Sequence, residues 1–198
     1  MEDATEKLDE LARSETQCTK CPEITACRLR AVAGGGHPHS TVMFVALAPS
    51  PEDEQADQNA GEVLLDSLVA YLPLLSNGAR GKAFATTVVK CVPRTADTLR
   101  QPTLEEQENC FAYLSREISI TTPHYVVPIG EQAARFLVGK LFHDSYADSY
   151  EPLLLRVYDS PAFKVVPIAS PGEIESMDAK TRRDYTDRLH SLSTVMNA

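Results

Sequence analysis

Three short apolar runs, separated by stretches of helical periodicity, constrain the fold of this chain more than any other feature. The runs cover residues 41–47, 83–89 and 124–129 and have the sequences TVMFVAL, AFATTVV and HYVVPI. A continuous apolar run of this length is typical of a strand that is buried on both faces. Such strands occur in parallel sheets that helices cover on both sides.

Helical patterns fill the intervals between these runs. Apolar residues recur every three or four positions in residues 4–13, 59–75, 131–141 and 178–196, and Thr103 with Glu106 forms the capping box of a further helix. Two more strand candidates cover residues 153–158 and 163–168.

This alternation of strands and helices predicts an α/β fold. The expected architecture is a three-layer sandwich, in which helices cover both faces of a central, mostly parallel sheet. Residues 1–198 are expected to form one domain, whose N-terminal helix and cysteine loop occupy about residues 1–40.

The composition and the apolar runs indicate where the protein is located and how its cysteines are used. No apolar run approaches the roughly 18–20 residues that span a bilayer, and the acidic start MEDATEKLDELARSE resembles neither a secretory signal nor a transit peptide. A cytoplasmic location without a membrane partner is therefore expected, with a monomer as the default oligomeric state. Five cysteines without an export signal favour metal or cluster ligation over disulfides.

Four of the cysteines are candidate ligands. Cys18 and Cys21 form a C-x2-C pair in a loop, while Cys91 ends a buried strand and Cys110 lies in the capped helix. Zinc, redox and iron–sulfur sites all use C-x2-C pairs. Cys110 could instead be a small buried apolar residue, so the residues alone leave these alternatives open. Cys27 is more simply interpreted as a loop thiol.

Basic residues gather near these cysteines. The candidates for DNA contact are Arg28, Arg30, Arg80, Lys82, Lys90 and Arg94. A net charge of −9 disfavours non-specific coating of nucleic acid, although a local basic face can still bind phosphates. Solvated faces of an acidic protein are the alternative interpretation of the same residues.

Ligands of open parallel sheets bind outside the carboxyl ends of the strands. Here that rule selects four segments, which are Ala48–Pro49–Ser50, Lys90–Cys91, Gly130–Glu131 and Ser170–Pro171–Gly172.

With these motifs in place, the chain resembles the family-four uracil-DNA glycosylases, the iron–sulfur branch of that superfamily. The resemblance covers almost the whole chain in the family's order. Its motifs are C-T-K-C-P at 18–22, the strand leading into Ala48–Pro49, A-G-x-x-L-L-D at 60–66, T-V-V-K-C-V-P-R at 87–94 followed by Pro102, Glu106 and Cys110, and P-H-Y-V-V-P-I-G-E-Q-A-A-R-F-L at 123–137. The resemblance implies a single glycosylase-like domain, DNA as partner, and a 4Fe–4S cluster held by Cys18, Cys21, Cys91 and Cys110.

The same resemblance exposes four departures at the active site. Glycosylases must flip a nucleotide into a pocket, recognise its base and stabilise the charge that develops as the base leaves. The family's acidic residue before Ala-Pro-Gly is Leu47 here, and its histidine in the His-Pro-Ser loop is Ser170. Its base-recognising asparagine is Thr87, and its stacking aromatic has no counterpart between Glu54 and Ala60. The implied base pocket comprises Ala48, Pro49, Ser50, Thr87 and Ser170.

Removing a single hydrogen-bond donor that stabilises the developing charge commonly lowers the rate of the chemical step by a factor of about 10²–10³. The departures therefore predict an iron–sulfur, glycosylase-like protein that binds DNA or a DNA-processing partner and has lost or repurposed base excision. One alternative is a working, divergent glycosylase that removes uracil or another damaged base. Another is an acidic protein-binding module without DNA contact. A polar slot at Ser50, Thr87 and Ser170 would favour catalysis, and a continuous basic face would favour DNA over a protein partner.

Overall fold

The computed structural model describes residues 3–56, 83–96, 98–143 and 151–196. The helix predicted at 59–75, the A-G-x-x-L-L-D motif, Arg80 and Lys82 lie outside the described residues.

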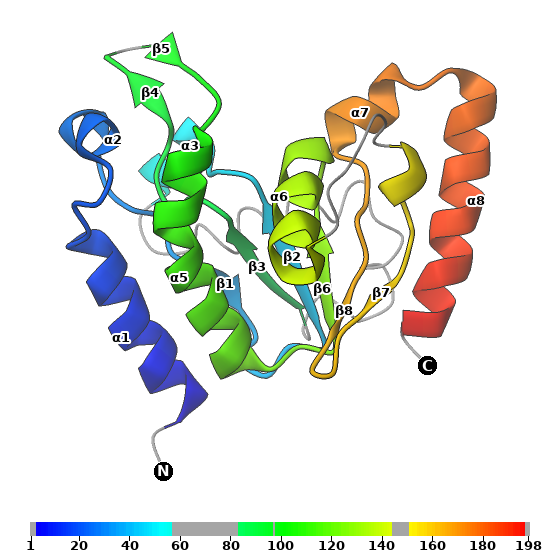
Figure 1. Ribbon diagram of the computed structural model, residues 1–198, viewed down its shortest axis with the longest axis horizontal. Coiled ribbons are helices and arrows are strands. Elements are labelled where there is room, and N and C mark those ends of the chain that lie inside the picture. The colour runs from blue at the N-terminus through cyan, green and yellow to red at the C-terminus, as the bar shows by residue number, and fades with distance from the viewer. Residues whose placement is uncertain (1–2, 57–82, 97, 144–150, 197–198) are drawn as a thin grey trace.

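A six-stranded sheet with the order β1-β3-β2-β6-β8-β7 forms the centre of the molecule (Figure 1). Its strands are β1 (Gly35–Gly36), β2 (Val42–Ala46), β3 (Ala83–Thr87), β6 (Tyr125–Pro128), β7 (Tyr158–Asp159) and β8 (Lys164–Val165). The four inner strands pair in parallel, whereas β1 and β7 pair antiparallel at the two edges. The predicted, mostly parallel sheet is confirmed.

Alternate residues of the inner strands enter two different cores. Met43 and Val45 of β2 pack with Leu114 and Leu137 from two helices, whereas Phe44 packs on the other face. That second core includes Tyr185 and Leu189 of the last helix. Described helices thus cover both faces, which explains why β2 has a continuous apolar sequence.

The helices of the described residues lie before, between and after these strands. They are α1 (Ala4–Thr16), α2 (Pro22–Cys27), α3 (Pro51–Gln55), α5 (Leu104–Thr121), α6 (Glu131–Phe142), α7 (Pro171–Ser176) and α8 (Ala179–Met196), with a 3-10 turn at Glu151–Leu153. The capping box predicted for α5 is present, since Thr103 Oγ1 accepts from the Glu106 amide at 3.2 Å and the Glu106 carboxylate accepts from the Thr103 amide at 2.7 Å. None of the described helices is both long and apolar enough to cross a bilayer.

The structure differs from the sequence-based expectation in the short elements. The strand predicted at 153–158 is wrong, because the 3-10 turn occupies its start and Leu155 has a φ of 61°, which interrupts an extended chain. Three short helices were not predicted, although α2, α3 and α7 each have proline at the first helical position. A small hairpin of β4 (Arg94–Thr95) and β5 (Thr98–Leu99) was also not predicted.

Candidate functional site

The carboxyl ends of the parallel strands bring most of the predicted pocket residues to one edge of the sheet. Ala46 of β2 is the direct partner of Thr87 of β3. The pairing continues beyond the strands, because the Val88 amide donates to Ala46 O at 2.9 Å and the Val89 amide donates to Leu47 O at 3.0 Å. The loop that starts at Leu47 is therefore held directly against the end of β3.

Ser50 and Ser170 have the same local role in two different loops. Each is the N-cap of a short helix, with its hydroxyl accepting from an amide three residues later, at 3.1 Å from Asp53 and at 3.3 Å from Glu173. The Glu173 carboxylate accepts from the Ser170 amide at 2.7 Å and from the Glu131 amide at 3.0 Å. One carboxylate thus joins the loop after β6 to the loop before α7. Each hydroxyl can still donate one hydrogen bond.

Leu47 and Thr87 occupy less open positions. Leu47 is half-buried and packs against the core under α5 and α6. Thr87 is buried, and its hydroxyl has no hydrogen-bond partner among the described residues.

A cleft of about 250 Å³ lies beside the loop after β2 and is lined by Leu47, Ala48, Pro49, Ser50, Pro51, Val92, Pro93, Leu99, Arg100, Gln101 and Pro102. Thr87 and Ser170 do not line this cleft.

The four candidate ligands line one small cavity. Cys18 and Cys21 precede α2, Cys91 follows β3, and Cys110 lies on α5. Burial raises the pKa of the Cys110 thiol to about 12, although nearby Lys90 offsets part of this rise. Two N–H groups already point at sulfur atoms, since Arg28 Nη1 lies 3.1 Å from Cys91 Sγ and the Lys90 amide lies 3.2 Å from Cys110 Sγ.

This cavity fits an iron–sulfur cluster by donor type and by placement. Four sulfur ligands from three elements are the usual donor set of such clusters, and N–H donors stabilise anionic sulfur. Within the described residues, however, no three His, Cys, Asp or Glu side chains are arranged closely enough to hold a single metal ion. Cys27 does not line the cavity, and it is the last residue of α2 instead of the loop residue that the sequence suggested.

Lys90, one of the predicted DNA contacts, has its side chain in the interior of the protein. Its side chain is 2% exposed, and its ammonium lies 2.6 Å from Glu117 Oε2 and 2.9 Å from Thr87 O. Burial opposes the charged form, but the carboxylates of Glu117 and Glu15 outweigh it and raise the pKa of Lys90 above its ordinary value. An enclosed ammonium of this kind is inaccessible to phosphate.

The described arginines near the cysteines also turn towards the protein. Arg28 donates to the Thr16 and Cys18 carbonyls at 3.1 and 2.7 Å. Arg94 pairs with Glu54, whose side chain is fully buried, and Arg30 Nε donates to Glu54 O at 2.9 Å. Because these groups are engaged internally, the described members of the predicted set do not form one exposed basic face.

Sequence reasoning missed two kinds of residue. The buried acids Glu15, Glu54 and Glu117 carry no local signal. The partners of Glu54 and Glu117 are distant in sequence, and neither carboxylate oxygen of Glu15 has a hydrogen-bond partner among the described residues. The exposed basic residues Lys180, Arg182 and Arg183 start α8 next to α7 (Figure 1). Their K-T-R-R sequence, ten residues after Ser170, was a signal that could have identified them.

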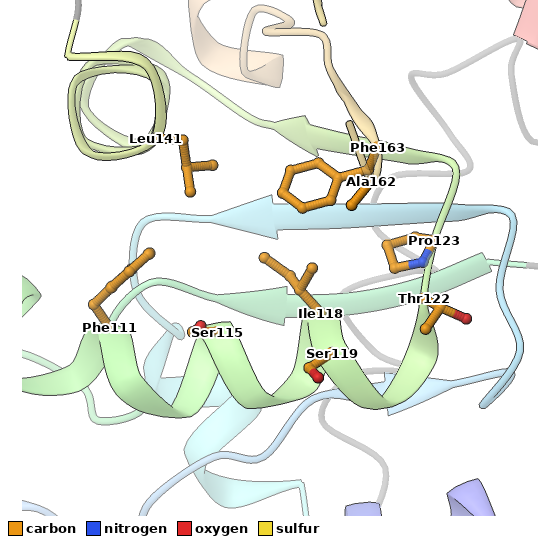
Figure 2. A pocket seen from close by; sticks show the side chains of 9 residues that line it. All are labelled: Phe111, Ser115, Ile118, Ser119, Thr122, Pro123, Leu141, Ala162 and Phe163. Atoms are coloured by element: carbon orange, nitrogen blue, oxygen red, sulfur yellow. The ribbon is translucent and has the colours of Figure 1, made fainter. Parts of the chain in front are cut away.

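A second cavity lies far from these loops. It has a volume of about 430 Å³ and is lined mainly by apolar side chains of α5, the end of α6 and the turn between β7 and β8 (Figure 2). Pro123 lies two residues before β6 and Phe163 lies directly before β8, so this part of the wall is at the amino ends of the strands. The cavity is therefore separate from the predicted base pocket.

Comparison with known proteins gives a consistent result. The sequence model of the uracil DNA glycosylase superfamily matches residues 33–191. The chain is 29% identical over 140 residues to the type-4 uracil-DNA glycosylase of Sulfurisphaera tokodaii. The aligned residues make up 69% of this chain and 60% of that protein. The chain is 30% identical to the type-4 enzyme of Archaeoglobus fulgidus and 34% identical to that of Pyrobaculum aerophilum, over 67% of this chain and 64% of each relative. The match thus spans less than two thirds of each relative's length. The chain belongs to the uracil DNA glycosylase superfamily.

Proposed function

We propose that this chain is an iron–sulfur DNA glycosylase that removes uracil or another damaged base from DNA. The observation that carries the proposal is the gathering of the loop after β2, the end of β3 and the N-cap of α7 at the carboxyl edge of a glycosylase-superfamily sheet. The relatives are named type-4 uracil-DNA glycosylases, and their names lend no support to the expected loss of excision.

We assign the chemical step to Ser170, which stands where the family has its histidine. Its hydroxyl accepts from the Glu173 amide and keeps its own hydrogen for an oxygen of the leaving base. A neutral hydroxyl stabilises developing negative charge less than a charged donor, so turnover is expected to be slower by about 10²–10³ than with the family's histidine. Leu47 has no group that can activate water.

Exposed basic residues at the start of α8 are the proposed phosphate contacts. Lys180 and Arg183 are exposed at the start of α8, and α8 follows α7, which starts just after Ser170 (Figure 1). Arg182 donates to the Ile174 and Glu175 carbonyls and so fixes α8 against α7.

The four cysteines would hold the 4Fe–4S cluster. When bound, the cluster supplies a cross-link between the N-terminal loop, the end of β3 and α5. The Arg28 guanidinium and the Lys90 amide would donate to its thiolate sulfurs.

The second candidate function is binding of DNA without excision. It is favoured by the burial of Thr87 and by the packing of Leu47 on the core, which leave neither position with an exposed polar group for a base.

A single-turnover excision assay on uracil-containing single- and double-stranded DNA separates these functions. We expect slow release of uracil that disappears in Ser170→Ala and increases in Thr87→Asn, because an amide makes a paired contact with the base edge. Binding without release of any base would replace the proposal with the second candidate. Absence of DNA binding would leave the acidic protein-binding module.

The cluster is tested separately, with Cys27 as the matched control. Anaerobically purified protein should be brown and absorb broadly at roughly 400 nm, as thiolate-ligated iron does. Cys18→Ser and Cys110→Ser should lose iron and sulfide, whereas Cys27→Ser should retain both. Stoichiometric zinc in place of iron would contradict this part of the proposal.

A further inference from the structure

A buried ion pair lies between the cysteine cavity and the end of β3. Lys90 and Glu117 each have a side-chain exposure of 2%, and their charged atoms are 2.6 Å apart. Thr86 joins the pair, because its hydroxyl donates to Glu117 Oε2 at 2.8 Å and accepts from Lys90 Nζ. The second carboxylate oxygen of Glu117 accepts from the Gly34 amide at 3.2 Å.

The approach of Gly34 to this pair requires a glycine. A Cβ added at Gly34 would lie 2.7 Å from Glu117 Oε1 and 2.6 Å from the ring of Phe84. The segment around Gly34 is therefore fitted to the ion pair, and the pair connects this segment to α5 and to the residues that follow β3.

Lys90 contacts the cysteine site and the proposed pocket at the same time. Its backbone amide donates to Cys110 Sγ, and the next residue is Cys91. Its ammonium donates to Thr87 O at 2.9 Å. Thr87 is followed by the two amides, of Val88 and Val89, that hold the Ala46–Leu47 segment of the pocket loop.

We infer that Lys90 is a positioning residue that transmits the state of the cysteine site to the loop at Leu47. The inference rests on the proposed function, because that function makes the loop part of a base pocket. Through Thr87 O, the ammonium fixes the chain where β3 passes into the cysteine site, and the adjacent amides then fix the loop.

An apolar pair at positions 90 and 117 would fill the same space, but it would not fix the loop at Leu47. Buried ion pairs add little stability compared with well-packed apolar residues of similar volume. An apolar side chain at position 90, however, leaves the Thr87 carbonyl and the Thr86 hydroxyl without their donor. The ion pair therefore matters for position more than for stability.

The test uses the double variant Lys90→Met/Glu117→Gln. Lys90→Met alone leaves a buried, unpaired carboxylate and is expected to fold poorly. In the double variant, the new amide side chain at position 117 keeps an acceptor for the Gly34 amide, and methionine keeps most of the lysine volume. The matched control is Lys140→Met/Glu108→Gln, which makes the same two changes in a half-exposed pair between α6 and α5.

Amide hydrogen exchange is the readout, because it needs neither DNA nor catalysis. In the double variant, the amides of Val88 and Val89 should exchange at least about tenfold faster, while those of Phe44 and Val127 change by less than about threefold. The control variant should leave all four amides unchanged. Equal acceleration of all four would show a purely structural role, and no acceleration would show no role; either result overturns the inference.

A third variant tests the connection with the cysteines. Cys110→Ser in the otherwise unaltered chain should accelerate exchange at Val88 and Val89, and the same change in the double variant should add less than about threefold, because coupled changes are not additive. Full additivity would overturn the inference. A chain that shows this pattern and releases no base would keep the inference and lose the proposed function.

Discussion

The cysteine side and the α7–α8 side of the molecule use basic residues in opposite ways. On the cysteine side, Lys90 and Arg94 pair with buried carboxylates and Arg28 donates to backbone carbonyls and a sulfur. On the other side, Lys180 and Arg183 are exposed at the start of α8. A cluster of basic residues in a sequence therefore indicates candidates for a DNA surface, and the positions of the buried acids decide among them.

The physical reason lies in the cost of burying charge. A buried carboxylate is destabilising by several kcal/mol unless a cation and hydrogen bonds compensate it. Glu54 and Glu117 are buried, so the nearest basic side chains turn inwards. Lys180 and Arg183 form no ion pair with a buried acid among the described residues, and their charges remain in solvent.

The largest expected effect comes from breaking an inward pair. Arg94→Met leaves the fully buried Glu54 without its cation and should lower the free energy of unfolding by about 3–5 kcal/mol, measured by urea denaturation. The double variant Arg94→Met/Glu54→Gln should recover much of the loss. Arg183→Met, on the exposed side, should change stability by less than about 0.5 kcal/mol. Equal losses at the two sites would contradict the comparison.

A second prediction concerns Glu15 behind the cysteine site. Burial chiefly raises the pKa of this carboxyl from 4.5 to about 8, although Lys90 lowers it in part. Between these pH values the unfolded chain has released the proton that the folded chain retains, so stability falls as pH rises. The fall should be on the order of 5 kcal/mol across this pH range, since each unit by which the pKa is raised corresponds to about 1.4 kcal/mol. Glu15→Gln should remove this slope in urea titrations at several pH values, and an unchanged slope would assign it to other groups.

Two helix N-caps, one at the start of α7 and one at the start of α5, provide a test with a smaller expected change in stability. Ser170→Ala and Thr103→Ala each remove a hydroxyl that accepts from an amide three residues later, and each should cost about 1 kcal/mol in thermal or urea unfolding. Only Ser170→Ala should also affect excision, since Thr103 lies at the start of α5. Loss of excision in both variants would indicate a general effect of stability instead.

The smallest effect on stability, and the most specific for DNA, is expected at the exposed cations. Arg183→Gln should leave the unfolding free energy within about 0.5 kcal/mol and reduce the salt dependence of DNA binding by about one phosphate contact. Arg30→Gln should leave that salt dependence unchanged, because its guanidinium donates to the Glu54 carbonyl. The opposite outcome would place the DNA surface on the cysteine side.

The sequence alone determined the features that depend on neighbouring residues. The apolar runs predicted β2, β3 and β6, and the Thr103–Glu106 box predicted the start of α5, because burial on both faces and capping are local requirements. The Cys18–Cys21 pair was visible for the same reason. Leu155 shows the limit, since its left-handed φ interrupts a segment whose composition favours a strand.

The tertiary structure alone decided the partners of the buried charges. Lys90 and Glu117 are 27 residues apart, and Glu54 and Arg94 are 40 apart, so no local pattern connects them. Lys90 precedes the candidate cluster ligand Cys91 and was therefore predicted to contact DNA. In the fold, however, α5 places the Glu117 carboxylate next to the Lys90 ammonium. Because the energy of a buried charge depends on what surrounds it in space, only the assembled fold could show that Lys90 belongs to the interior.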